Sequence, residues 1–516
     1  MGLGMVATAG AGFLSVAAML NSGSAHADPD DPPEIIGLVI GGSGDPYPGS
    51  GYVGLANGLY IDNPLQMHPN FPGTTYPAPY ANGLYTPEQW YPIEGVHNEY
   101  INYPNDAAGF SDQSTSVGQG VTILQNAINT NFHAGDVSTV FGYSQSAIIA
   151  SQVMEQLDPN NTPGGGSIPQ ADLQFLLIGD PNNPNGGLLE RFNGFETTAT
   201  GTVHDELNLP SLGVAFDGAT PADAYPTDIY TLEYDGLADF PRYPLNFLSD
   251  LNAFLGFAEI HGTYLTEPVD GVGPSVEQIA TATLLPGSAL DSVTDSLTNY
   301  YMIDETPPLV ALLPAPLQAL LGPDLTYLIN LGYGDGSEGY SVTPDSPADV
   351  ATPFGLFPDV SMKDVFTNLI ADTKDGMATF QSYLADPSSF TAATSPLDSG
   401  LAGQSLADAM STLHADLAAD PSASLSELIN AITSASSAAY SALLPTADII
   451  NSLVTSMPAY DVSLFTDSLS NGGGLLDALG LPLAADTALV TLAAGFEVDV
   501  IQNTIAEIAS AFSGAL

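Results

Sequence analysis

The chain contains no cysteine. This absence excludes disulfide bonds, thiolate metal ligands and a cysteine nucleophile, and it leaves the redox compartment open. The spacings typical of metal sites, such as H-E-x-x-H or paired histidines, do not appear either. The sequence therefore predicts no metal site.

Basic residues are almost as scarce. Lysine and arginine together number 4, against 58 aspartates and glutamates, and the formal net charge is −54. The four cationic residues are Arg191, Arg242, Lys363 and Lys374. Proteins that bind nucleic acids or anionic membranes neutralise phosphates with lysine and arginine, so this composition argues against both partners. It indicates high solubility and a substrate whose reacting part is neutral.

Long apolar runs are missing beyond the first 27 residues, so the sequence predicts no transmembrane span. Within those residues, Met5 to Leu20 is an apolar, small-residue run, and Ala25-His26-Ala27 forms an A-x-A cleavage pattern. No lysine or arginine precedes the run. Either the true start codon lies upstream or the signal is atypical, and the pattern favours a signal peptide over residues 1–27.

The full chain is long and apolar enough for two domains, since 44% of its 516 residues are hydrophobic. Apolar runs predict buried strands before about residue 330, and helical spacing of apolar residues predicts helices between them. The predicted strands are 34–40, 99–103, 137–141, 173–178 and 229–236, and the predicted helices are 112–129, 146–157 and 246–257. This alternation predicts an α/β fold with a parallel, doubly wound sheet that binds ligands at the carboxyl ends of its strands.

The character of the sequence changes after about residue 330. A linker-like stretch rich in glycine, serine and proline covers residues 332–347, and alanine, serine, leucine and aspartate dominate from Met362 onward. The predicted helices here are 362–385, 403–418, 423–443 and 484–512. They are typical of a structural helical module, with a cap or a partner-binding tail as alternatives.

Residues 137–157 carry the most informative pattern. A strand ends at Gly142-Tyr143-Ser144-Gln145-Ser146, and a helix follows at once. A serine on a sharp strand-to-helix turn is the arrangement of a nucleophile elbow, which exposes the hydroxyl above the sheet. The motif here is G-x-S-x-S, with Ser146 where glycine is usual. Ser144 is therefore the candidate nucleophile.

A serine nucleophile needs a base to take its proton and an acid to orient that base. His261 alone follows the last predicted strand–helix unit, where an α/β-hydrolase places its base. The other histidines are His26 in the signal segment, His68, His97 and His133 before the serine, His204 before the last predicted strand, and His414 in the helical region.

Three aspartates compete for the position of the acid. Asp235 ends a predicted strand, and Asp239 lies in the turn that follows. Asp239 is preferred, because the acid usually lies in the loop after the strand, but Asp235 stays open. Asp180 ends an earlier strand and is a third candidate. Paired carboxylates for glycoside hydrolysis are not excluded among so many acids, although no distinctive pair appears.

The first predicted strand leads into the glycine-rich loop Gly41-Gly42-Ser43-Gly44-Asp45-Pro46. Neither G-x-G-x-x-G nor a phosphate-binding lysine is present, so the loop does not predict a nucleotide cofactor. No other cofactor is indicated. The loop is either a plain turn or part of an oxyanion hole, in which Ser43 and backbone N–H groups would receive a developing negative charge.

Several of these stretches together resemble the PE-PPE domain of mycobacteria. They are Ile40–Pro46, Thr86–Ile93, Gln119–Leu124, Gly142–Ala147, Tyr234–Pro241 and His261–Tyr264, and they follow in order over roughly residues 35–330. The resemblance implies a cutinase-like α/β-hydrolase with Ser144 as nucleophile, His261 as base and Asp239 as acid. It also implies an oxyanion hole of Ser43 and the Gln145 N–H.

The domain organisation that follows is a signal peptide over 1–27, a PE-PPE α/β-hydrolase domain over 28–332 and a helical region over 333–516. A signal-like segment stands where many members of the family carry a PE or PPE helical module, which favours a general export route. The expected location is secreted or in the cell envelope, with envelope association.

The resemblance implies a serine esterase or lipase-like enzyme that cleaves acyl esters through an acyl-enzyme. One alternative is an acyltransferase that moves fatty or mycolic acyl groups onto a sugar such as trehalose or onto other envelope glycolipids. Another is a non-catalytic envelope scaffold that keeps the fold.

Overall fold

A computed structural model describes most of the chain outside the first 34 residues. The described residues are 35–43, 45, 48–61, 80–84, 116–131, 137–157, 168–193, 208–209, 214–216, 218–266, 273–291, 296–386, 388, 390–393, 430, 433–434, 436–438 and 443–513. The predicted signal peptide, the predicted strand at 99–103 and the predicted helix at 403–418 lie outside them. So does most of the predicted helix at 423–443.

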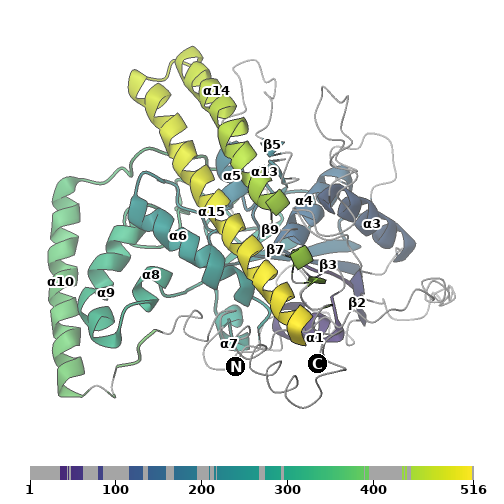
Figure 1. Ribbon diagram of the computed structural model, residues 1–516, viewed down its shortest axis with the longest axis horizontal. Helices are drawn as coiled ribbons and strands as arrows, with labels where there is room; N and C mark the ends of the chain where they lie inside the picture. The colour runs from purple at the N-terminus through teal and green to yellow at the C-terminus, as the bar shows by residue number, and fades with distance from the viewer. Residues whose placement is uncertain are drawn as a thin grey trace.

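A seven-stranded sheet forms the centre of the molecule (Figure 1). Its order is β2-β1-β3-β4-β7-β9-β8, and all neighbours pair in parallel except the antiparallel pair β8–β9. The strands are β1 (Ile35–Ile40), β2 (Tyr80–Leu84), β3 (Val137–Tyr143), β4 (Leu173–Ile178), β7 (Thr227–Leu232), β8 (Thr283–Leu284) and β9 (Thr298–Ile303). A separate hairpin joins β5 (Asn208–Leu209) and β6 (Val214–Ala215).

Side chains that alternate along the strands feed two separate hydrophobic clusters, one on each face of the sheet. Leu38 and Ile40 of β1 belong to one cluster, whereas Val39 between them belongs to the other. Both faces are covered by helices, which is why the strands are apolar on both sides. The predicted parallel α/β sheet is therefore confirmed.

The helices of the α/β unit lie largely where helical spacing predicts them. They are α1 (Ser50–Leu55), the π-helical η1 (Ala56–Ile61), α3 (Ser116–Asn131), α4 (Gln145–Leu157), α5 (Leu188–Asn193), α6 (Phe247–Glu259), α7 (Val276–Ala280), α8 (Pro308–Ala311) and α9 (Ala315–Asn330). The helices α3 and α4 pack on the first cluster, and η1 packs on the second.

The strand β9 is the main departure from the predicted topology. It follows His261 in the chain, so the unit ending at His261 is not the last one. Its sequence Thr-Asn-Tyr-Tyr-Met-Ile lacks the continuous aliphatic run typical of a buried strand, yet all six residues are buried. Tyrosines fill the space, and the ring of Tyr301 stacks on that of Tyr230 in β7 at 4.7 Å.

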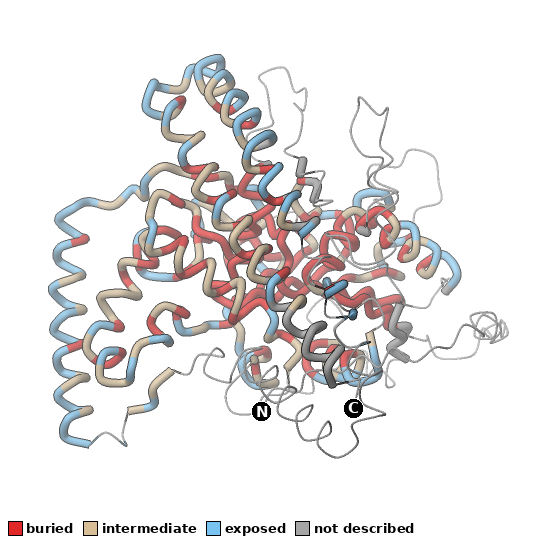
Figure 2. The backbone as a smooth tube through the Cα atoms, viewed as in Figure 1, coloured by how far each residue is buried: buried red, intermediate tan, exposed pale blue. Residues whose placement is uncertain are grey.

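The helical region packs against the α/β unit. It contains α10 (Met362–Ala385), α13 (Leu443–Val454), α14 (Ser456–Ser470) and α15 (Leu475–Ser513). α10 coincides with a predicted helix and lies along α9 at the edge of the molecule, where its outer side is exposed (Figure 2). α15 crosses α6, and its Leu489, Leu492 and Phe496 join the first cluster of the sheet (Figure 1).

One segment among the described helices is long and apolar enough to cross a membrane by length and composition. It is Leu475–Val498 in α15, with a mean hydropathy of 1.5, and 39% of its most apolar stretch is buried in the protein. This helix contacts α6, α13 and α14.

A buried arginine joins the segment after α9 to the α/β unit. Arg191 in α5 is fully buried and donates hydrogen bonds to the carbonyl oxygens of Phe240 and Thr352 and to the hydroxyl of Ser341. Burial lowers the pKa of Arg191 to about 10. Residues 341–354 therefore pack on the same core as the sheet.

Candidate active site

The predicted strand–turn–helix is present around Ser144. β3 ends at Tyr143, α4 begins at Gln145, and Ser144 between them has a positive φ of 57°. Residues other than glycine rarely adopt this backbone conformation, and the strain is typical of a nucleophile elbow. Gly142 is required there, because a Cβ would lie 2.7 Å from the carbonyl oxygen of Ser146.

Ser146 has a structural role that explains the departure from the usual glycine. Its hydroxyl accepts a hydrogen bond from the backbone N–H of Tyr143 at 2.8 Å. The same hydroxyl has two carbonyl oxygens as acceptors for its hydrogen, that of Tyr143 at 3.0 Å and that of Ile40, at the end of β1, at 3.1 Å. Ser146 therefore ties the elbow to the neighbouring strand.

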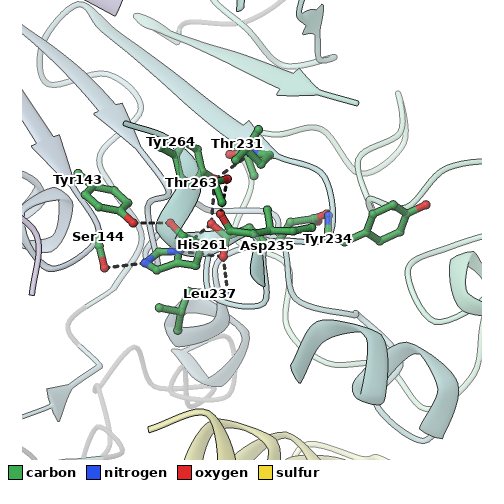
Figure 3. Close-up of polar contacts among 12 residues, drawn as sticks. Tyr143, Ser144, Thr231, Tyr234, Asp235, Leu237, His261, Thr263 and Tyr264 are labelled. Carbon is green, nitrogen blue, oxygen red and sulfur yellow. Dashed lines mark hydrogen bonds and ion pairs between the residues drawn. The ribbon is translucent and has the colours of Figure 1, made fainter. Parts of the chain in front are cut away.

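His261 lies within hydrogen-bond distance of both Ser144 and Asp235 (Figure 3). Its Nε2 is 2.8 Å from the Ser144 Oγ, and its Nδ1 is 2.8 and 2.9 Å from the two carboxylate oxygens of Asp235. With the proton on Nδ1 facing the carboxylate, Nε2 is the acceptor for the serine hydroxyl hydrogen. The structure thus brings Ser144 and His261 together as the sequence predicts.

The carboxylate beside His261 corrects the preference for Asp239. Asp235 is fully buried and also accepts hydrogen bonds from the Tyr264 hydroxyl at 2.8 Å and from the Leu237 N–H at 3.0 Å. Asp239 instead accepts from the backbone N–H of Tyr234 at 2.9 Å. Because Tyr234 has a φ of 65°, the chain turns directly after the strand. This turn directs the side chain of Asp235, and not that of Asp239 in the loop, toward the imidazole.

Asp239 and Asp180 are buried in other surroundings. Burial raises the pKa of Asp239 well above its usual range, although the Tyr234 N–H opposes that shift. Asp180 accepts hydrogen bonds from the Thr220 hydroxyl at 2.5 Å and the Asn182 N–H at 3.0 Å. Burial raises the pKa of Asp180 to about 6. Neither environment is that of a carboxylate paired with histidine.

Aromatic rings enclose the imidazole of His261. The Tyr143 ring lies 5.4 Å away at 32°, and the Phe257 ring lies 6.2 Å away and nearly parallel at 22°. The Tyr143 hydroxyl donates to the carbonyl oxygen of His261, which fixes the backbone of that residue. Sequence reasoning missed Tyr143, Phe257 and Tyr264, although Tyr143 stands inside the elbow motif.

The glycine-rich loop lies against the elbow. The Ser43 hydroxyl donates to the Gln145 side-chain oxygen at 3.2 Å. A Cβ on Gly42 would lie 2.9 Å from the Tyr143 ring, so glycine is needed for this close approach. Gln145 is the first residue of α4, where the aligned peptide dipoles give a positive end. Ser43 and Gln145 therefore flank Ser144 on one side.

The remaining predicted residues have plain outcomes. His26, His68, His97, His133, His204 and His414 lie outside the described residues. Among the residues that the structure describes, no three His, Cys, Asp or Glu side chains form a group able to hold a metal ion.

Comparison with known families supports the resemblance seen in the sequence. The family model described as the PE-PPE domain matches residues 77–334, half of the chain. The chain belongs to the PE-PPE domain family.

Relatives of this PE-PPE chain come from Mycobacterium tuberculosis. The PPE family protein PPE28 is 38% identical over 91% of this chain and 65% of its own length. The esterase PE16 is 37% identical over 62% of this chain and 51% of its own length. The diacyltrehalose acyltransferase Chp2 is 26% identical over 36% of this chain and 50% of its own length. The PE-PPE chain thus spans between half and two thirds of the length of these relatives.

Proposed function

We propose that this PE-PPE protein is a serine hydrolase that cleaves acyl esters. The observation that carries the proposal is the continuous hydrogen-bonded series Ser144–His261–Asp235 on a strained elbow. The similarity to the esterase PE16 supports the same class of reaction.

The geometry supports an acyl-enzyme mechanism. The Ser144 Oγ attacks the ester carbonyl carbon while the His261 Nε2 takes the hydroxyl proton. Asp235 holds the imidazole in the tautomer with the proton on Nδ1 and stabilises the imidazolium that forms. His261 then gives its proton to the departing alcohol oxygen, and Ser144 keeps the acyl group. Water attacks this acyl-enzyme with His261 again as base, which releases the acid and restores the serine.

The negative oxygen of the tetrahedral intermediate needs donors on the side where Ser43 and Gln145 lie. In this proposal the Gln145 N–H, at the positive end of α4, is one donor. The Ser43 hydroxyl is the other, after it turns away from the Gln145 side-chain oxygen to which it donates.

Transfer of the acyl group to a sugar hydroxyl is the second candidate. The similarity to the diacyltrehalose acyltransferase Chp2 favours it, and the mechanism differs only in the nucleophile that attacks the acyl-enzyme. Trehalose is the acceptor to test first. A scaffold without catalysis is the third candidate, and the hydrogen-bonded Ser144 and His261 speak against it.

Fluorophosphonate labelling of the purified full chain tests the proposal. The probe phosphonylates an activated serine hydroxyl, and mass spectrometry of peptides finds the modified residue. We expect an adduct on Ser144 that disappears in Ser144→Ala and persists in the matched control Ser382→Ala, which changes an exposed serine of α10. Correctly folded protein that fails to react would contradict a serine hydrolase and favour the scaffold. Once labelling succeeds, release of free acid with and without trehalose separates hydrolysis from transfer.

The place of action is part of the proposal. The signal-like pattern of residues 1–27 supports a secreted or envelope-associated protein, and a lipid acyl ester is the substrate class expected there. Fractionation of cells that express the chain with and without residues 1–27 tests this location. Retention of both forms in the cytosol would contradict it.

A further inference from the structure

Helix α10 carries a stripe of exposed apolar side chains. The exposed fractions of the five residues run from 51% to 64%. At 3.6 residues per turn they fall within an arc of about 80° and extend over about 33 Å of the helix. They are Met362, Phe366, Ile370, Met377 and Leu384. Large apolar side chains that gather in one line, instead of lying singly, mark a surface that meets a partner.

The stripe is not the face by which α10 packs on the rest of the molecule. Among the described elements, α9 is the main neighbour of α10, and Val365 and Gly376 are buried. A Cβ on Gly376 would lie 2.2 Å from the carbonyl oxygen of Leu320 in α9, so glycine lets the two helices approach. These two positions lie about a quarter turn from the centre of the stripe. The stripe therefore stays exposed beside the contact with α9, at the edge of the molecule (Figure 2).

Both lysines of the chain border this stripe. Of the four cationic residues in the sequence, Arg191 is buried and Arg242 is half-buried. The other two, Lys363 and Lys374, are exposed on α10. At helical spacing they lie next to Ile370, on the edge of the stripe that faces away from Val365 and Gly376. The apolar side chains and the exposed cations are thus gathered on one side of one helix.

The aspartates of α10 lie on other sides of the helix. Asp364, Asp372 and Asp375 are each at least about 120° from the centre of the stripe at helical spacing. One acid lies near the stripe, because Thr373 donates a hydrogen bond to Asp324 of α9 at 3.1 Å. A charge that leaves water for an apolar medium costs free energy. The side with the stripe can therefore approach such a medium at a lower cost than the opposite side of α10.

We propose that α10 docks on a lipid surface that has no net charge. The stripe contacts the acyl chains, and the stems of Lys363 and Lys374 lie along it while their ammonium groups reach the lipid phosphates. A straight stripe on the outer edge fits a flat surface, whereas a protein partner would need a groove of the same length. With a net charge of −54, the rest of the chain is repelled by anionic lipids, which favours uncharged headgroups.

The inference goes beyond the proposed function, since it concerns where the protein binds and not the reaction at Ser144. Binding is therefore measured in the Ser144→Ala background, so that its result does not depend on ester hydrolysis. Hydrolysis of p-nitrophenyl butyrate is measured separately with Ser144 in place, and the stripe variants should not change it. Failure of the docking and failure of the reaction are thus distinguishable.

Sedimentation with sucrose-loaded phosphatidylcholine vesicles tests the docking. Phe366→Gln combined with Ile370→Gln removes the apolar centre of the stripe at two exposed positions. We expect the partition coefficient of this double variant to fall at least about tenfold, because two large side chains no longer leave water. The matched control combines Val462→Gln with Leu469→Gln, two exposed apolar positions of α14. The control should bind like the native chain.

The lysines are tested in the same assay. Lys363→Gln combined with Lys374→Gln should weaken binding about threefold, since exposed ion pairs are weak. Asp375→Asn changes one charge on the opposite side of the same helix and should leave binding as it is. Tighter binding to phosphatidylglycerol vesicles than to phosphatidylcholine vesicles would overturn the preference for an uncharged surface.

A tryptophan in the stripe gives a second readout. The sequence contains a single tryptophan, Trp90, so a variant adds one signal to a known background. We expect the added fluorescence of Phe366→Trp to be quenched by phosphatidylcholine brominated on its acyl chains. The fluorescence added by the control Val462→Trp, on α14, should not be quenched. This measurement locates the contact on α10 even where another part of the chain also touches the vesicle.

Three results would overturn the inference. They are a native chain that stays in solution, a stripe variant that binds as tightly as its control, and a tryptophan at position 366 that is not quenched. Light scattering adds a fourth. A native dimer that dissociates when Phe366 and Ile370 are replaced would make the stripe an interface between copies of the chain.

Discussion

Asp239 accepts a hydrogen bond from the backbone N–H of Tyr234, one residue before Asp235. This contact holds the left-handed turn at Tyr234, where φ is 65°. The two acids therefore have different roles. Asp239 fixes the turn, and Asp235 faces His261. A residue in an uncommon backbone conformation persists only where its surroundings hold it, and such residues cluster at active sites.

Removing the charge from Asp235 should affect catalysis much more than the same change at Asp239. Asp235→Asn leaves an amide beside the imidazole, which favours the wrong tautomer, and we expect kcat/KM for butyrate esters to fall by about three to four orders of magnitude. Asp239→Asn keeps an oxygen acceptor for the Tyr234 N–H, so we expect less than about a tenfold loss. Steady-state hydrolysis, with circular dichroism to verify folding, measures both. A larger loss in Asp239→Asn than in Asp235→Asn would restore Asp239 as the orienting acid.

The hydroxyl of Ser146 should contribute to stability. Ser146→Ala removes the buried hydroxyl that accepts a hydrogen bond from the Tyr143 N–H, and we expect the free energy of unfolding to fall by about 1–3 kcal/mol. Urea unfolding followed by fluorescence measures this change. Thr130→Ala is the control, since it removes an exposed helix hydroxyl that donates to Asn126, and it should cost less than about 0.5 kcal/mol. Equal costs would show that the tie to β1 is unimportant.

The branched guanidinium group of Arg191 should be required for stability, and a lysine at this position should not replace it. Lysine keeps the charge but cannot reach the Phe240 and Thr352 carbonyl oxygens together, so Arg191→Lys should lower the free energy of unfolding by at least about 2 kcal/mol. The half-buried Arg242 gives the matched control Arg242→Lys, for which we expect a smaller loss. Unfolding midpoints in urea compare the two. A loss at Arg242 that matched the loss at Arg191 would argue against the buried fork as the cause.

Asp250 should make the protein less stable as the pH rises. Its pKa is raised by burial from 3.8 to about 8, so the native state holds a proton that the unfolded chain releases above about pH 4. The stabilising contribution is thus complete below the unfolded pKa and is lost as the pH rises through the folded pKa. We expect the native protein to lose stability relative to Asp250→Asn between about pH 5 and about pH 8. Urea unfolding of both proteins across this range measures the difference, and parallel curves would contradict it.

Local patterns were sufficient to predict much of the framework. Strands β1, β3 and β4 and helices α4 and α10 lie within a few residues of their predicted ranges, because each carries its own apolar periodicity. The strand β9 escaped prediction because tyrosines and an asparagine fill it, and their burial depends on neighbours far away in the chain.

The candidate site was predicted unevenly for a related reason. The residues that flank Ser144 were enough to predict the elbow, since Gly142 and the strand–helix boundary mark it. His261 was chosen by chain order, and the premise that it follows the last strand–helix unit was wrong, because β9 comes after it. The choice between Asp235 and Asp239 depends on the backbone angle φ at Tyr234. A positive φ is not expected at a tyrosine, so the sequence did not predict this turn.

The sequence by itself determined the α/β class, the elbow at Ser144 and the absence of thiol chemistry, because these follow from residue types and from periodicity over short stretches. Only the tertiary structure decided which acid faces His261, which rings enclose it and where α15 lies. Those features join segments separated by tens to hundreds of residues, and packing in three dimensions, not local preference, selects among them.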